Sequence, residues 1–107
     1  MSDDLTVHDS SGNVFEDMGM PEVSLRLAKA ELARAIRNVL RERDLTQTEA
    51  ARILGVTQPD VSNLLRGKLA RFSEKKLEDF LLRLGMDVTV RITPSRSEHG
   101  RRLVEIG

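Results

Sequence analysis

The sequence predicts a mainly α-helical bundle that contains a helix-turn-helix and ends in a short pair of β-strands. Three observations lead to this prediction. Apolar residues recur every three to four positions between residues 21 and 85, and glycine follows several of these periodic segments. Two of the segments are short and lie on either side of Gly55, separated only by a tight turn. After Gly85 the apolar period shortens to two, which is typical of a half-buried strand.

The chain has 107 residues, which is the length of one domain, and its charge is unevenly distributed. We expect residues 1–20 to form a flexible acidic arm, residues 21–85 to form the helix-turn-helix domain, and residues 86–107 to form the C-terminal strands. Formal net charge is zero, yet residues 1–20 contain five acidic and no basic residues, while residues 21–72 contain ten basic and six acidic ones. Because salt confines each field to about 8–10 Å, the basic middle can still contact phosphate.

Composition argues against several classes of function. The chain has no cysteine, which excludes disulfides and thiolate metal sites. His8 and His99 lie far apart in polar segments, and we expect neither a metal ion nor a cofactor. The sequence contains no recognisable catalytic triad and no Gly-rich phosphate loop, so we do not expect an enzyme. No apolar run is long enough to span a bilayer, and the acidic start is not a secretory signal. We therefore expect a cytoplasmic protein with no membrane partner.

A long helix is expected from Pro21 to Arg43, because proline suits the first turn of a helix. One face of it carries the apolar residues Leu25, Ala28, Leu32, Ala35, Ile36, Val39 and Leu40. Its first half also has a second apolar strip, formed by Val23, Leu27 and Ala30, on roughly the opposite side. This strip either packs against Val14 and Phe15 of the arm or forms a partner surface, and the sequence favours neither alternative.

The segment from Leu45 to Gly67 predicts two short helices with defined ends. Thr46 and Glu49 match a capping box at the start of the first helix, and Gly55 is expected to end it. Thr57 is expected to cap the second helix. The side chains expected to face the core are Ala50, Ile53, Leu54, Val61, Leu64 and Leu65.

The second short helix keeps a polar row that a core does not require. Gln58 and Asn63 can each form two hydrogen bonds to adenine, and Ser62 can serve a donor or an acceptor on a base edge. Residues placed to contact phosphate are Gln47, Arg66, Lys68 and Arg71. The alternative is an ordinary corner of two helices with a solvated face. The basic flanks, and glutamine, serine and asparagine where glutamate and lysine are usual, favour DNA binding.

A fourth helix is expected from Glu74 to Leu84, with Ser73 as its N-cap. Beyond it, apolar residues alternate with polar ones from residue 86 to residue 92, and residues 101–106 can form a second strand. A lone two-stranded hairpin is marginal in water, so we expect these strands to pack on the helices or to pair with a second subunit.

The stretch LTQTEAARILGVTQPDVSNLLRGK resembles the Cro/CI (Xre) helix-turn-helix family, which has a lambda-repressor-like fold. The wider layout of VFEDMG, ELARAIRNVLRERDLTQ and GKLARFSEKKLEDFLLRLGMDVTVRI resembles the HigA-like antitoxin branch of that family. The resemblance implies five core helices and a homodimer that binds a palindromic operator in double-stranded DNA and represses its own operon. It also implies a RelE/HigB-like toxin as partner.

Residue by residue, the resemblance places base contacts at Gln58, Ser62 and Asn63. It places phosphate contacts at Gln47, Thr57 and Arg66. The chain departs from the family where a strand pattern replaces the fifth helix. That departure moves the expected dimer contacts to Leu82, Val88, Val90 and Ile92.

Two functional hypotheses follow. In the first, the chain is a transcriptional repressor and also the antitoxin of a type II toxin-antitoxin module. The acidic arm would then cover a basic toxin together with the surface formed by Val14, Phe15, Met18, Val23 and Leu27. In the second, the chain is a stand-alone Xre-type regulator with no toxin partner.

Overall fold

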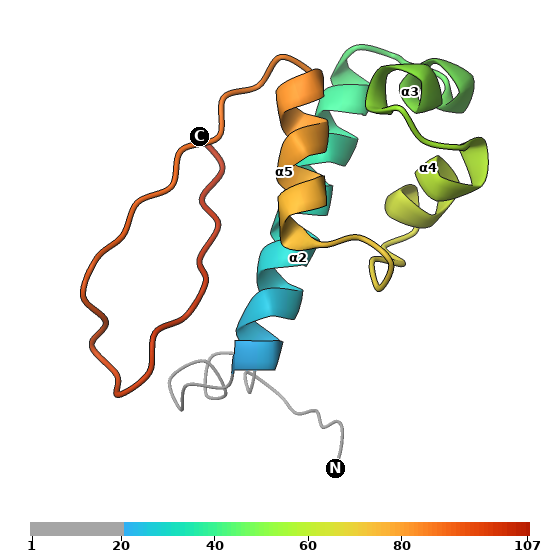
Figure 1. Cartoon of the computed structure of the whole chain (residues 1–107). Helices are drawn as coiled ribbons and strands as arrows, with labels where there is room; N and C mark the ends of the chain where they lie inside the picture. The colour runs from blue at the N-terminus through green and yellow to red at the C-terminus, as the bar shows by residue number, and fades with distance from the viewer. Residues whose placement is uncertain (1–20) are drawn as a thin grey trace. The chain divides into compact units, whose positions relative to one another are not determined.

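The computed structural model describes residues 21–107, and its regular structure is entirely helical (Figure 1). Its helices are α2 (Pro21–Glu42), α3 (Gln47–Leu54), α4 (Gln58–Leu65) and α5 (Glu74–Arg83). The expected helices and the helix-turn-helix are therefore confirmed, close to their expected bounds. The described residues fall into two compact units, residues 29–90 with 104–107 and residues 21–28 with 91–103.

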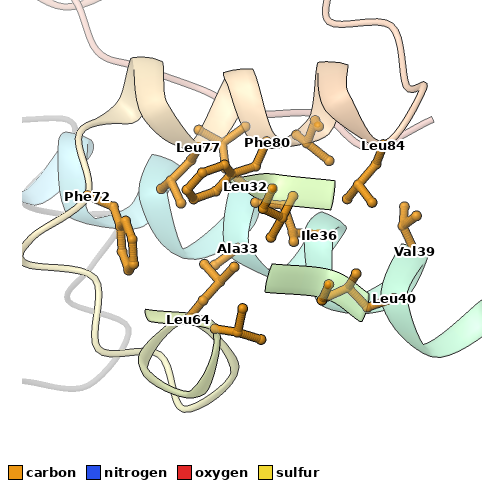
Figure 2. Packing of buried hydrophobic residues seen from close by; sticks show 14 of the residues in the cluster. Leu32, Ala33, Ile36, Val39, Leu40, Leu64, Phe72, Leu77, Phe80 and Leu84 are labelled. Carbon is orange, nitrogen blue, oxygen red and sulfur yellow. The ribbon is translucent and has the colours of Figure 1, made fainter. Parts of the chain in front are cut away.

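The larger unit is built around an apolar core to which its helices contribute (Figure 2). Figure 2 shows Leu77 and Phe80 of α5 directed toward Leu32 and Ile36 of α2. Phe80 is fully buried and meets Phe72 edge to face, with ring centroids 5.7 Å apart. Such burial, worth about 1.5–3 kcal/mol for each large apolar side chain, holds the short helices α3 and α4 in place, because helices of that length are unstable alone.

The predicted C-terminal strand pair is wrong, since residues 86–107 contain no strand in this structure (Figure 1). Val88 and Val104 do pack against the core, as a half-buried strand would require. Val90 and Ile92, however, are 72% and 91% exposed, so the alternating pattern is not matched by alternating burial. An isolated two-stranded hairpin is only marginally stable in water, and the exposed Val90 and Ile92 add no burial that would stabilise one. The resemblance implies five core helices, and the described residues 21–107 contain four.

The smaller unit joins the first turns of α2 to residues 91–103 through a buried hydroxyl. Ser24 is only 1% exposed, and its Oγ donates to the backbone oxygen of Arg102 at 3.2 Å. The same Oγ accepts a hydrogen bond from the backbone N–H of Arg102. Burial of a hydroxyl is costly unless it is hydrogen-bonded, and this exchange satisfies Ser24 in both directions.

The acidic arm, including Val14, Phe15 and Met18, lies outside the described residues. Across residues 21–107, every helix is too short or too polar to cross a membrane.

Candidate DNA-binding surface

The first helix of the motif, α3, begins at a complete capping box. The backbone N–H of Thr46 donates to Oε1 of Glu49 at 2.9 Å, and the backbone N–H of Glu49 donates to Oγ1 of Thr46 at 3.1 Å. The hydrogen bond from the Thr46 backbone, helped by the Thr46 side chain, lowers the pKa of Glu49 below its ordinary value of 4.5. The predicted box is confirmed, and it fixes where α3 starts.

The turn between the motif helices depends on Gly55. Its φ of 73° lies in the left-handed region, and its N–H donates to the oxygen of Ala51 at 2.9 Å. Ala51 is buried in the apolar core. The glycine at position 55 therefore lets α3 end in a left-handed turn that leads directly to α4.

The second motif helix, α4, begins at another complete capping box. The backbone N–H of Asp60 donates to Oγ1 of Thr57 at 3.2 Å, and the N–H of Thr57 donates to Oδ2 of Asp60 at 3.4 Å. Thr57 was expected as the cap, but the return bond to Asp60 was missed, although the spacing of three residues signals it. The Asp60 carboxylate is thereby engaged at the start of its own helix.

The expected base-contacting residues lie on the outer side of α4, whose inner side is closed by the buried Val61 and Leu64. Gln58 is exposed, while Ser62 and Asn63 are half-buried. The Oδ1 atom of Asn63 accepts a hydrogen bond from Nη2 of Arg66 at 3.1 Å. Arg66, which is expected to contact phosphate, therefore also holds the side chain of Asn63, which is expected to contact a base.

Gln58 is held by a residue that the sequence did not single out. Its Nε2 donates to Oγ1 of Thr48 at 3.0 Å, ten positions earlier in the chain. Thr48 lies on α3, and its nearness to Gln58 is created by the crossing of the two helices. No local pattern in the sequence could have signalled this contact.

The expected phosphate contacts are spread over three parts of the motif. Gln47 is the first residue of α3, where free backbone N–H groups favour an anion. Arg66 is the C-cap of α4, and Lys68 and Arg71 follow in the connection to α5. All four side chains are exposed. Thr57 is exposed too, but its Oγ1 already accepts the capping bond described above.

A cavity of about 360 Å³ lies beside Gln47, where α2, α3 and α4 meet. Two arginines of α2, Arg37 and Arg41, line it together with Asp44 and an apolar floor. The floor consists of Leu40, Leu45, Ala50, Val61 and Leu65. The sequence had placed Arg37 and Arg41 only within the basic middle of the chain, and the structure brings both next to the start of α3.

The residues expected to contact other proteins are divided between the two units. In the larger unit, Leu82 is 54% exposed and Val90 is strongly exposed, whereas Val88 is half-buried against the core. In the smaller unit, Ile92 is almost fully exposed, Leu27 is 40% exposed and Val23 is half-buried.

Comparison with known proteins gives two matches and one negative result. The model of a family described as a helix-turn-helix domain matches residues 14–93. A solved structure of an XRE family transcriptional regulator is 32% identical to this chain, with a TM-score of 0.71. That match covers 80% of this chain and 97% of the other. No curated protein matches.

Proposed function

Because the chain belongs to the Xre family of helix-turn-helix transcriptional regulators, we propose that it is a repressor that binds a specific operator sequence. The observation that carries the proposal is the two-sided character of α4. Its inner side is closed by Val61 and Leu64, while its outer side offers amide and hydroxyl groups that the core does not use. A helix of this kind can enter the major groove with its polar side toward the bases.

In this proposal Gln58, Ser62 and Asn63 contact base edges, and the surrounding residues contact the backbone. Amide side chains are suited to adenine because they offer one donor and one acceptor. The proposed phosphate contacts are Gln47, Thr57, Arg66, Lys68 and Arg71. They lie on α3, at the two caps of α4 and in the connection to α5, and they are not assigned to base edges.

Selection of bound DNA from a random pool tests the proposal directly. We expect a defined palindrome, and we expect Asn63→Ala to lose about 1–3 kcal/mol on it and to relax one base position. Lys68→Ala is the matched phosphate variant, because Arg66 also holds Asn63 and would mix the two effects. Lys68→Ala should weaken binding to all sequences and lower the salt dependence by about one counterion. Recovery of DNA without any common sequence would refute the proposed repressor.

A palindromic operator requires two copies of the chain, related by a twofold axis. We place the dimer contacts at Leu82, Val88, Val90 and Ile92. The exposure of Leu82 and Val90 supports this assignment for the larger unit. Val90→Asp should yield monomers in sedimentation. An unchanged dimer in the Val90 variant would place the interface elsewhere.

The second candidate function is that of an antitoxin that neutralises a RelE/HigB-like toxin. It is favoured by Leu27, an exposed leucine on α2, and by the five acidic residues among residues 1–20. Val14, Phe15, Met18 and Val23 complete the proposed toxin-binding surface. The charge of these acidic residues is complementary to that of a basic RNA-cleaving enzyme.

Co-expression with a toxin-like product of a neighbouring reading frame tests the antitoxin role. Leu27→Asp should lose neutralisation but keep operator binding, and Asn63→Ala should do the reverse. If Leu27→Asp and a chain lacking residues 1–20 both neutralise normally, the assigned surface is wrong. If no neighbouring product is toxic, the chain is a stand-alone regulator.

A further inference from the structure

The side-chain amide of Gln58, the first residue of α4, is held by a residue of the other motif helix. Its Nε2 donates to Oγ1 of Thr48 at 3.0 Å, and both side chains are exposed. We infer that Thr48 is a positioning residue that orients the Gln58 amide so that it selects adenine at one base pair. This inference rests on the proposed function and adds to it a residue outside the reading helix.

The direction of the hydrogen bond follows from the neighbour that Thr48 would have in a complex with DNA. A threonine hydroxyl has one proton to donate and two lone pairs to accept with. Thr48 is the second residue of α3, at the helix end where a phosphate is expected. Because a phosphate oxygen only accepts, it would take the proton of Thr48. The lone pairs of Oγ1 then remain free to accept the hydrogen bond from Nε2 of Gln58, which is the direction seen in the structure.

This orientation determines which base Gln58 can read. With one N–H of Nε2 committed to Thr48, the amide still presents one N–H and the oxygen Oε1. Adenine offers the complementary pair in the major groove, with N7 as acceptor and the N6 amino group as donor. Guanine offers two acceptors there and would leave Oε1 facing a lone pair. In this arrangement Thr48 contacts a phosphate of the DNA backbone and at the same time holds Gln58 in the orientation that favours adenine over guanine.

The test uses the full chain and the operator that it selects from a random pool. Gln58→Ala first identifies the base pair that Gln58 reads, and operators carrying guanine in place of adenine at that position are then titrated. Thr48→Val keeps the shape of the side chain and removes the hydroxyl. We expect it to weaken operator binding about 3–10-fold, the range for one net hydrogen bond, and to reduce the adenine preference at that position.

Two controls separate positioning from a general loss. Thr48→Ser keeps the hydroxyl and should retain the adenine preference. In the Gln58→Ala background, Thr48→Val should have no further effect on base preference, because the group that it orients is gone.

The inference is overturned if Thr48→Val keeps the full adenine preference, or if its effect on that preference is the same with and without Gln58. It is also overturned if Gln58→Ala changes no base preference. If the unmodified chain selects no common sequence, the proposed function fails as well, so the two failures are distinguishable.

Discussion

The turn glycine, Gly55, lies against the guanidinium group of Arg83 on α5. A Cβ added at Gly55 would stand 3.2 Å from Nη1 of Arg83, and the φ of 73° would in addition strain any residue with a side chain. Arg83 is itself paired with Asp79 of the same helix at 3.1 Å. At residue 55 the turn therefore leaves room for the Arg83 side chain, and its backbone has a conformation that favours glycine.

We predict that Gly55→Ala lowers the free energy of unfolding by about 1–2 kcal/mol, the cost of a left-handed residue with a Cβ. Urea unfolding measures the change. Because the Arg83 guanidinium is the far end of a flexible side chain, it can move aside. Adding Arg83→Ala to Gly55→Ala should therefore restore little stability. Full restoration of the free energy of unfolding would show that the contact between the added Cβ and Arg83 causes the loss, and that the left-handed φ does not.

Asp44, between α2 and α3, also has a positive φ, of 53°. Its N–H donates to the oxygen of Arg41, and that backbone bond does not depend on the side chain. We predict that Asp44→Gly raises the free energy of unfolding by up to about 1 kcal/mol, since relief of the left-handed strain exceeds the entropy that glycine adds to the unfolded chain. Thermal unfolding gives the comparison. Asp44→Ala should not stabilise the chain, and a lower unfolding temperature for Asp44→Gly would contradict the assignment of strain.

The two capping threonines should each contribute to stability. Thr57→Ala removes the acceptor for the backbone N–H of Asp60, and we predict a loss of about 1 kcal/mol. Thr89→Ala is a suitable control, because Thr89 is exposed and lies outside the helices. Unfolding in urea at one temperature compares the two variants. Equal stability of both would show that the box at α4 adds nothing.

The lowered pKa of Glu49 predicts a dependence of stability on pH. A carboxyl whose pKa is lower in the folded chain stabilises the fold above its unfolded-state pKa, and that contribution is lost as the pH falls through the folded-state pKa. Glu49→Gln keeps an acceptor for the Thr46 N–H but cannot ionise.

The difference in stability between the unmodified chain and Glu49→Gln should therefore be largest near neutral pH and should shrink in acid below 4.5, the ordinary pKa of the group. Unfolding curves recorded across this window measure it. A difference that stays constant with pH would mean that the charge of Glu49 does not contribute.

The sequence allowed prediction of those features that depend on neighbouring residues. The ends of α3 and α4 follow from the residue types at Thr46, Gly55 and Thr57, because a cap is made within one turn. The strand pair failed for the opposite reason. Val88 and Val90 have the spacing of a strand, but whether a strand forms depends on a distant pairing partner, which the alternating pattern does not specify.

The candidate site divides in the same way. The polar side of α4 could be read from the periodicity of Val61 and Leu64, whose burial leaves Gln58 and Asn63 outside. The contact between Gln58 and Thr48 could not, because it depends on how closely two helices cross. The same holds for Arg37 and Arg41, which reach the cavity beside α3 only through the packing of α2.

The hydrogen bond between Ser24 and Arg102 joins residues 78 positions apart, and this separation sets an order of events during synthesis. The chain is made from its N-terminus, so helices α2 to α5 are all synthesised before Arg102 is added. Until then the hydroxyl of Ser24 remains hydrated. The contact at Ser24 is therefore among the last parts of the fold that the growing chain can form, after every residue of the helix-turn-helix has been made.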